Sequence, residues 1–250
     1  MSRASGYWGM DRAFWPVLGL LAVVLIGFEF TDLDLAVQDR LFDFQANQWR
    51  VDRDDPLLRT LFYTGPKVLL ILVGVGVIAL VVGPAGWRER CGLSYPTGRR
   101  HLLVLLATLA TGPALVGFGK NVTNVFCPSE IRRYGGDVPY VTLCGAYPEG
   151  DRPERKGHCF PAGHASGGFA LVALAGLAQT RRGRRLGMAA GMVAGGIMGT
   201  YQMLKGAHYL SHTVFTCLFI GWIFLLWRRL LGVAERGTGN SSVPGLQKRS

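Results

Sequence analysis

Acidic residues are scarce in this sequence: 16 Asp and Glu stand against 27 Lys and Arg, which gives a formal net charge of +11 at pH 7. In a soluble protein such an excess would indicate nucleic-acid binding. Here the arginines stand in clusters at the ends of apolar blocks, where membrane topology explains them better. We therefore expect no nucleic-acid partner.

The middles of the apolar blocks lack charged residues, although 49% of all residues are hydrophobic. Each block is about as long as the 17 to 25 residues that cross a bilayer core. This absence of charge inside the blocks gives little support to a transporter. The best count is six transmembrane helices, at about residues 14–30, 67–82, 102–119, 165–178, 186–204 and 213–231.

The first apolar block lacks the small-residue cleavage pattern that ends a signal peptide. It begins at Phe14, after Arg3 and Arg12, and leads into an acidic segment, so we interpret it as an uncleaved helix. The last residues, 233–250, mix Gly, Ser, Asn and Pro with basic residues and are expected to be disordered. The sequence thus predicts one all-α membrane domain over residues 1–232.

The arginine clusters fix the expected orientation. They lie in three segments that share one side of a six-span protein, at Arg88, Arg90, Arg99, Arg100, Arg181, Arg182, Arg184, Arg185, Arg228 and Arg229. The positive-inside rule places these segments and both termini in the cytoplasm. The aspartate-rich segment after the first span and the long polar segment at about 121–163 then face outward.

Glycine recurs every fourth residue in the fifth predicted span, at Gly187, Gly191, Gly195 and Gly199. Such a stripe lets another backbone approach closely. Packing inside the helix bundle is the more common use of a stripe of this kind, and a homodimer interface is the alternative.

Three polar constellations lie at the outer ends of spans three to six. Lys120 is followed eight residues later by Pro128, a Pro-Ala-Gly-His word ends at His164, and His208 and His212 open the sixth span. Each signal alone is weak, because a lysine that ends a span commonly extends to the interface. Together, on one side of the bilayer, they predict a functional site at the periplasmic membrane border.

At these residues the chain resembles the type-2 phosphatidic acid phosphatase family, the membrane lipid phosphatases related to vanadium haloperoxidases. The family pattern is K-x6-R-P, then P-S-G-H, then S-R-x5-H-x3-D. The chain has matching spacings across a motif core at 120–231, in Lys120-x6-Cys127-Pro128, Pro161-Ala162-Gly163-His164 and Tyr201-Gln202-x5-His208-x3-His212. Cys127 and Gln202 replace arginines, Ala162 replaces serine and His212 replaces aspartate, which indicates a divergent bacterial subgroup.

The resemblance implies a role for each matching residue. His208 is the expected nucleophile, which forms a phosphohistidine, and His164 the expected general acid and then base. Lys120 and the backbone amides at Ala162 and Gly163 are expected to hold phosphate oxygens. His212 lies four residues after His208, so on a helix it shares that face and could fix the tautomer of the nucleophile.

Two phosphate-binding arginines of the family are missing here, which leaves a deficit of positive charge. Lys205, three residues before the nucleophile, is the nearest candidate replacement, with Arg132 and Arg133 as further candidates. Gln202, in the place of one arginine, is also expected among the phosphate-binding groups.

The expected activity is metal-independent hydrolysis of a lipid phosphate or pyrophosphate at the outer face of the bacterial inner membrane, with no cofactor. Candidate substrates by resemblance are phosphatidic acid, phosphatidylglycerol phosphate, undecaprenyl pyrophosphate and lipid A phosphate. A phosphotransferase is a close variant, and a non-catalytic phospholipid-binding protein is the alternative that the four departures favour.

Five cysteines are present, and three of them, Cys127, Cys144 and Cys159, fall in the outward segment. An oxidising periplasm would allow one disulfide among three pairings. Cys127 and Cys159 each adjoin a motif, so that pair is favoured. A zinc site from cysteines and His158 is the alternative, but it lacks a paired short spacing.

Overall fold

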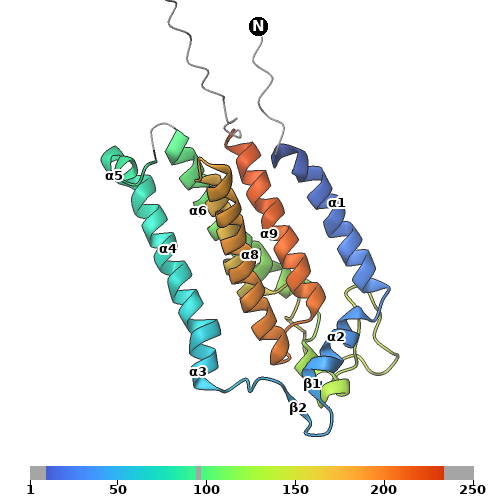
Figure 1. Cartoon of the computed structure of the whole chain (residues 1–250). Helices are drawn as coiled ribbons and strands as arrows, with labels where there is room; N and C mark the ends of the chain where they lie inside the picture. The colour runs from blue at the N-terminus through green and yellow to red at the C-terminus, as the bar shows by residue number, and fades with distance from the viewer. Residues whose placement is uncertain (1–9, 94–96, 234–250) are drawn as a thin grey trace, which may run out of the picture.

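The computed structural model describes residues 10–93 and 97–233 of the chain. Within these residues the protein is a bundle of long helices, joined at one end by a small cap that contains a two-stranded sheet (Figure 1). The tail predicted to be disordered lies outside the described residues, apart from Val233. The long helices are α1 (Met10–Glu29), α4 (Gly65–Val82), α6 (Thr97–Thr123), α8 (Arg181–Leu204) and α9 (Leu210–Leu230).

Four helical segments among the described residues are long and apolar enough to cross a membrane: Arg12–Glu29, Pro56–Val82, Gly98–Glu130 and Leu210–Leu230. The protein is therefore a multi-pass membrane protein. The other two predicted spans correspond to α8 and to α7 (Gly163–Ala170), which continues into the 3₁₀ segment η4 (Leu171–Gly176). Helix α8 is less apolar than the four segments, because glycines and the polar residues near its end lower its hydropathy, and α7 is short, so the count of six remains a prediction.

The second membrane helix begins earlier than the sequence indicates. A short helix α3 (Pro56–Arg59) runs through a π-helical turn, η1 (Thr60–Thr64), directly into α4. Proline lacks an N–H and crowds the preceding turn, so Pro66 would end a regular helix started before it. The wider π turn ahead of Pro66 lets the helix continue.

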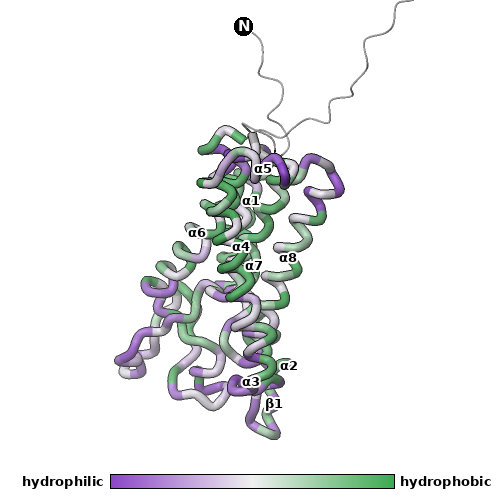
Figure 2. Tube along the Cα trace, turned by 90° about the vertical axis from the view of Figure 1, so that its left-hand side faces the viewer, coloured by the Kyte–Doolittle hydropathy of each residue, from purple (hydrophilic) through white to green (hydrophobic). Residues whose placement is uncertain are grey.

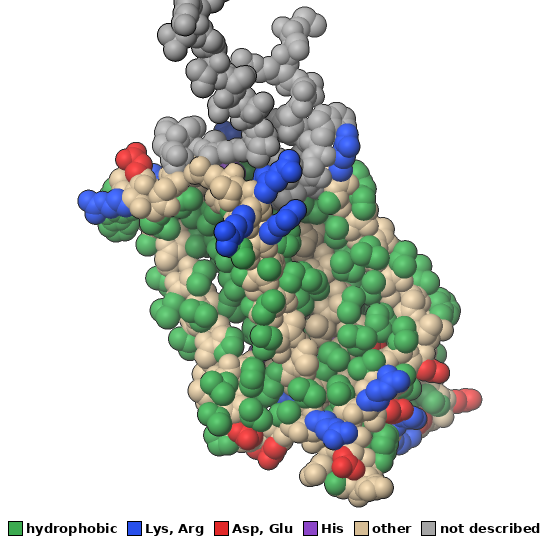
Figure 3. All heavy atoms as spheres, in the orientation of Figure 1, with side chains coloured by type: hydrophobic (Ala, Val, Ile, Leu, Met, Phe, Trp, Pro, Cys, Tyr) green, Lys and Arg blue, Asp and Glu red, His purple; other side chains and the backbone are tan. Residues whose placement is uncertain are grey.

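On the face shown in Figure 3, apolar side chains cover the middle of the bundle and charged side chains gather at its two ends. The hydropathy along the chain follows the same division, with hydrophobic residues along the helices and hydrophilic residues toward the ends (Figure 2). Helix α4 shows the pattern most clearly, because Leu69, Leu72 and Val75 are each between 58% and 62% exposed. Side chains of this kind remain exposed in a stable protein where lipid rather than water surrounds them.

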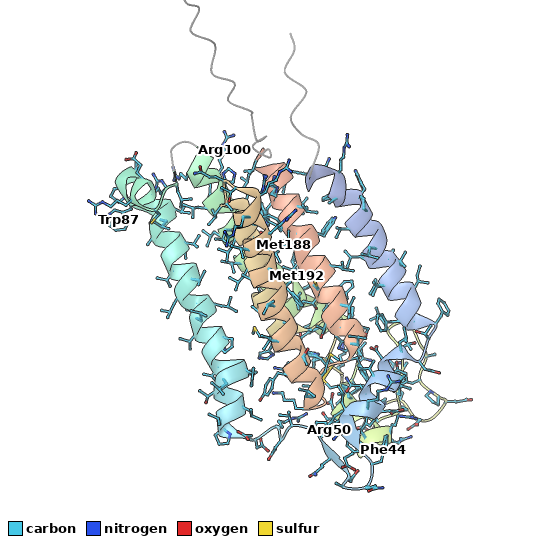
Figure 4. All side chains as sticks on the ribbon, in the orientation of Figure 1. Phe44, Arg50, Trp87, Arg100, Met188 and Met192 are labelled. Carbon is cyan, nitrogen blue, oxygen red and sulfur yellow. A yellow bond between two sulfur atoms is a disulfide. The ribbon has the colours of Figure 1, made fainter. Side chains whose placement is uncertain are left out.

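The two ends differ in the residues they carry. Trp87 and Arg100 lie at one end, and Arg50 and Phe44 lie at the other (Figure 4). The short arginine-bearing helix α5 (Ala85–Arg90), the start of α8 and the end of α9 all lie at the Arg100 end (Figure 1). The arginine clusters therefore lie at one end of the bundle, as the predicted topology requires. That this end faces the cytoplasm stays a prediction.

The glycine stripe of α8 is used inside the chain. A side-chain carbon at Gly187 would collide with the backbone of Ala175, and one at Gly191 would collide with Val172. At Gly195 the obstacle would be the ring of Phe169. The stripe lets α8 pack closely on α7 and η4, which is the intramolecular use predicted from the sequence.

The end opposite the arginine clusters is closed by a cap of short elements around an aromatic cluster. The hairpin pairs Phe42 with Trp49, and both rings contact Tyr134 at centroid distances of 5.3 and 5.1 Å. This cluster fixes the segments that carry the site. The cap elements are α2 (Leu33–Leu41), β1 (Phe42–Asp43), β2 (Gln48–Trp49), η2 (Pro128–Glu130) and η3 (Arg132–Tyr134).

Candidate active site

The three sequence motifs converge beneath the cap. The Thr123 hydroxyl, at the end of α6, donates to the carbonyl of Phe160 at 2.7 Å. The amide of Ala162, just before α7, donates to the Thr216 hydroxyl of α9 at 2.9 Å. These two bonds tie the ends of α6, α7 and α9 together, so residues 120, 164 and 208 share one region of the molecule.

A cavity of about 550 Å³ lies between α4, α6 and α7. Lys67, Lys120, Gly163 and His164 supply its polar lining. The rest of its wall is mostly apolar, from Leu70, Ile71, Gly74, Leu106, Leu109, Ala110, Pro113, Gly167 and Met198. A space of this kind combines cationic groups with a surface that an apolar chain can occupy.

Lys120 lies along the backbone at the start of α7. A side-chain carbon added to Gly163 would be 3.1 Å from Cε and 3.4 Å from Nζ of Lys120. Any residue larger than glycine would therefore push the lysine away. The first N–H groups of α7 have no carbonyl partner within their own helix, so the amine and the amides share one place where an anion could bind.

The neighbours of His164 include aromatic and cationic side chains from outside the motifs. Its ring lies 4.0 Å, centroid to centroid, from the ring of Tyr63. The Nζ atom of Lys205 lies 5.4 Å from the Tyr63 ring and 4.7 Å from the Tyr201 ring. Lys67, Lys120 and Lys205 are all close enough for their charges to act on His164.

Tyr63 and Lys67 were missed by the sequence reasoning, because both precede or begin the span predicted at 67–82. One signal in the sequence could have identified Lys67: lysine is rare in this chain, and Lys67 lies directly beside an apolar run.

A tight turn between α8 and α9 carries His208. Gly206 has a positive φ of 69°, and a side chain there would strike the ring of Trp49. The amide of Ala207 donates to the Gln202 carbonyl at 2.8 Å. The Gln38 side chain of α2 donates to the His208 carbonyl at 2.7 Å, so the cap holds this turn directly.

His208 and His212 are paired through their Nδ1 atoms, which are 3.4 Å apart, and both residues are 3% exposed. One nitrogen must donate and the other accept. Burial lowers the pKa of His208 well below its usual value of 6.5, and the charge of Lys120 acts in the same direction. The pair therefore favours neutral imidazoles, and a proton on Nδ1 of His208 would leave a free lone pair on its Nε2.

Asp34 of α2 secures the start of α9. Its two carboxylate oxygens accept from the amide of Ser211 at 2.8 Å and from the Ser211 hydroxyl at 2.5 Å. The Ser211 amide lies in the first turn of α9, where it has no intrahelical partner, so Asp34 caps the helix from another element. Neither Asp34 nor Gln38 belongs to a motif, and the sequence reasoning did not select them.

Two of the arginines considered as phosphate ligands are engaged elsewhere. Arg132 pairs with Asp151, with nitrogen–oxygen distances of 2.6 and 2.5 Å, and Arg133 pairs with Asp39 at 2.7 Å. Both are poor candidates for holding phosphate. Gln202, by contrast, is 3% exposed, and its amide nitrogen has no hydrogen-bond partner among the residues described.

Cys127 and Cys159 are joined by a disulfide, with their Cα atoms 5.1 Å apart. The Sγ atom of Cys159 lies 3.5 Å from Nδ1 of His208. In the described part of the chain, one group of side chains has the spacing to hold a metal, and it consists of Cys159, His208 and His212. His158, the candidate from the sequence, is exposed and contacts the Lys120 carbonyl at 3.2 Å instead.

A sequence model of the PAP2 superfamily matches residues 101–235, more than half of the chain. The chain belongs to the PAP2 superfamily. The family expected from the three motifs is thereby confirmed. The match begins within α6 and includes every motif residue discussed above.

Two relatives support the family assignment. The chain is 38% identical over 198 residues to the lipid A 4'-phosphatase of Francisella tularensis subsp. novicida (strain U112), which covers 76% of this chain and 82% of that protein. The crystal structure of a transmembrane PAP2-type phosphatidylglycerolphosphate phosphatase from Bacillus subtilis has a similar fold, with a TM-score of 0.51 and 13% identity over 87% of this chain and 94% of that one. In class, therefore, this PAP2 protein is a bacterial membrane lipid phosphatase.

Proposed function

We propose that this PAP2 protein removes a phosphate group from a lipid A-type glycolipid at the outer face of the inner membrane, through a phosphohistidine on His208. The observation that carries the proposal is the buried His208–His212 pair, whose Nδ1 atoms are 3.4 Å apart, together with a cavity that is lined by Lys67, Lys120 and His164. The substrate class is supported by the 38% identity to a lipid A 4'-phosphatase.

In the first step, the lone pair on Nε2 of His208 attacks phosphorus, and the bond from phosphorus to the lipid oxygen breaks. His164 donates its proton to the leaving oxygen. His212 accepts the Nδ1 proton of His208 in a hydrogen bond and so holds the attacking tautomer. The lipid alcohol leaves, and the phosphoryl group stays on His208.

In the second step, water attacks the phosphohistidine. His164, now neutral, takes a proton from this water, and the nitrogen–phosphorus bond breaks to release inorganic phosphate. The charge on the phosphoryl oxygens is balanced by Lys120 and by the amides that begin α7.

Lys67 and Lys205 supply the positive charge that the family draws from arginines. Both act on His164 together with Lys120, so the charges of three lysines are felt at the proposed general acid. Lys67 also lines the cavity, together with the apolar residues Leu70 and Ile71 of the same helix. A lipid could therefore place its phosphate among the lysines while an acyl chain follows α4 and α6.

Phosphate release from a panel of lipid phosphates, measured on purified protein in detergent with EDTA, tests this function. We expect the highest kcat/KM on a lipid A-type phosphate and little change on adding EDTA, because no metal takes part. The His208→Ala protein should form no phosphoenzyme and show no turnover. Wild-type turnover by that variant would exclude the assigned nucleophile, and failure on every lipid phosphate would favour a phospholipid-binding protein.

A phosphotransferase would use the same first step and pass the phosphoryl group to an acceptor other than water. Adding lipid or sugar alcohols to the assay separates the two activities. Phosphate that appears on the acceptor instead of in solution would identify transfer.

A further inference from the structure

The disulfide lies against the pair of histidines that the proposed reaction uses. Nδ1 of His208 is 3.4 Å from Nδ1 of His212 and 3.5 Å from Sγ of Cys159. The three ligand atoms all lie within 4.8 Å of one another, and all three residues are buried. Cys127 is bonded to Cys159, so its sulfur is also adjacent to this group.

The two distances from Nδ1 of His208, 3.4 and 3.5 Å, fit a tetrahedral metal site. With metal–nitrogen and metal–sulfur bonds of about 2.0–2.3 Å, two ligand atoms on a tetrahedral zinc ion are roughly 3.3–3.8 Å apart. Two cysteines and two histidines form a common set of structural zinc ligands. Thiolate and imidazole donors without carboxylates select Zn²⁺ over Mg²⁺ or Ca²⁺.

In the disulfide form the sulfur atoms are bonded to each other and have no thiolate charge to offer a cation. We propose that reduction of the Cys127–Cys159 disulfide creates a Zn²⁺ site from Cys127, Cys159, His208 and His212, and that zinc bound there inactivates the enzyme. The inactivation, but not the binding, rests on the role proposed above for His208.

A dithiol reductant supplies the electrons and protons that open the Cys127–Cys159 disulfide. The dithiol gives up two electrons and two protons and becomes a disulfide, while the protein disulfide becomes two thiols. Zinc binding then releases both thiol protons to solvent, because thiolates are the ligands. The disulfide thus keeps the two histidines free of metal.

Zinc and catalysis would need opposite tautomers of His208. The attacking form carries its proton on Nδ1 and its lone pair on Nε2. A metal at Nδ1 takes the lone pair there and leaves the proton on Nε2, where it blocks attack on phosphorus.

A route for the ion is also present. A cavity of about 40 Å³ reaches His212 and is bordered by Glu29 and Asp34. This volume is enough for one or two water molecules. Its acidic border would favour the entry of a cation.

Cobalt binding tests the proposal without relying on turnover. The protein would carry Ala at Cys91, Cys144 and Cys217, which are the free cysteines of the described residues. Non-reducing peptide mapping should first find Cys127 linked to Cys159. After reduction with a phosphine, which does not compete for the metal as a thiol would, Co²⁺ should give thiolate charge-transfer absorption and the intense visible bands of a tetrahedral site. One equivalent should saturate them, and the oxidised protein should show neither.

Two further variants separate ligation from folding. Cys127→Ser leaves the Cys159 thiol free without reductant and should bind Co²⁺ through three protein ligands. The matched control, Cys127→Ser/Cys159→Ser, also lacks the disulfide but should show no charge-transfer band. In the reduced protein, turnover should fall in proportion to Zn²⁺ occupancy and return with EDTA.

The proposal is overturned if neither the reduced protein nor Cys127→Ser shows a stoichiometric cobalt spectrum, or if His212→Ala keeps the same spectrum. Stoichiometric zinc binding without any loss of turnover would show that the bound metal does not inactivate the enzyme. A protein that binds Co²⁺ but never turns over a lipid phosphate would instead refute the proposed function.

Discussion

Asp34 offers the sharpest test of how the cap holds the catalytic turn. Its carboxylate accepts two hydrogen bonds from Ser211, at 2.8 and 2.5 Å, and Asp34 is 5% exposed. A buried hydrogen-bond donor that is left unsatisfied costs about 1–3 kcal/mol. Replacing Asp34 by Ala removes both acceptors and leaves the Ser211 amide and hydroxyl without partners, which should cost about 2–6 kcal/mol. The milder Asp34→Asn keeps one acceptor oxygen and should cost about 1–3 kcal/mol.

Thermal unfolding in detergent measures this loss. For a chain of this size, 1 kcal/mol corresponds to roughly 2–4 °C, so a loss of about 2–6 kcal/mol should lower the melting temperature of the Ala variant by roughly 4–24 °C. Turnover should also fall, with KM nearly unchanged, because Ser211 and His212 share the first turn of α9. We expect kcat to fall roughly tenfold, which corresponds to an increase of about 1.4 kcal/mol in the activation free energy.

Asp39→Asn is the matched control for Asp34→Asn. It makes the same change on the same helix, but the Asp39 side chain is 30% exposed, where it pairs with Arg133 and accepts from the Tyr134 hydroxyl at 2.9 Å, a bond that the amide oxygen of Asn can still accept. Exposed pairs of this kind contribute about 0–1 kcal/mol. If Asp34→Asn and Asp39→Asn lower the melting temperature equally, Asp34 does not cap α9 in the way described.

The same carboxyl group predicts a dependence on pH. Burial raises the pKa of Asp34 from its usual value of 3.8, against the opposing effect of the Ser211 hydrogen bonds. The folded protein therefore binds this proton more readily than the unfolded chain. The contribution of Asp34 to stability is largest below pH 3.8 and decreases as the pH rises through the raised pKa. Asp34→Asn should remove this part of the pH dependence of the melting temperature.

Two further predictions concern the phosphate site and the topology. Lys67→Gln should lower kcat/KM on the best lipid phosphate by about 10–10²-fold, because one cation of the proposed phosphate site is lost. The control Lys156→Gln, in the polar segment between α6 and α7, should change kcat/KM little. Equal effects of the two substitutions would mean that Lys67 does not bind the phosphate. Reporter fusions at Asp151 and Arg184 should localise to opposite sides of the membrane, with Asp151 outside, and the same side for both would exclude six spans.

Sequence periodicity and motif spacing predicted much of this architecture for a physical reason. A bilayer imposes a length on each span, so α1, α6 and α9 could be located from apolar runs alone. The convergence of Lys120, His164 and His208 followed from their shared position at the same end of the predicted spans. These inferences needed no knowledge of tertiary contacts.

Long-range contacts could not be predicted in the same way. Arg132 and Arg133 were considered because of their charge, but their partners lie 19 and 94 residues away in the sequence. The hydrogen bond from Gln38 to His208 joins residues 170 apart. No local pattern encodes such pairs, and the cap that makes them is an irregular structure without a periodic signal.

The start of the second span was predicted too late, because a local sequence feature suggested a helix boundary that the structure does not have. Gly65 and Pro66 resemble a helix boundary, yet a π-helical turn over Thr60–Thr64 carries the helix past them. This extension places Tyr63 beside His164, with a centroid distance of 4.0 Å. The unnoticed extension thus concealed Tyr63, whereas Lys67 stood at the predicted start of the span and belonged to no motif.

The departures from the family motif offset one another in part. Gln202 and Cys127 remove two positive charges relative to the pattern, while His212 removes the negative charge of one aspartate, so the net loss is one positive charge. At about 6 Å and an effective dielectric constant of about 20, one negative charge would oppose a bound phosphate by about 3 kcal/mol. In the proposed site, a neutral His212 would therefore leave less charge for the lysines to supply in place of the arginines.

This balance predicts a coupled effect of His212 and Gln202. His212→Asp alone should raise KM, because it adds a negative charge beside the phosphate, while kcat is kept or increased by the stronger proton acceptor. His212→Ala should lower kcat without that rise in KM. Adding Gln202→Arg to His212→Asp should bring KM back, since a cation returns to the position where the Gln202 amide is now unpaired. The double-mutant cycle should show a coupling free energy of about 1–3 kcal/mol between the two sites. Additive effects on KM would mean that the two positions do not share the charge of one bound phosphate, and the argument from charge balance would be wrong.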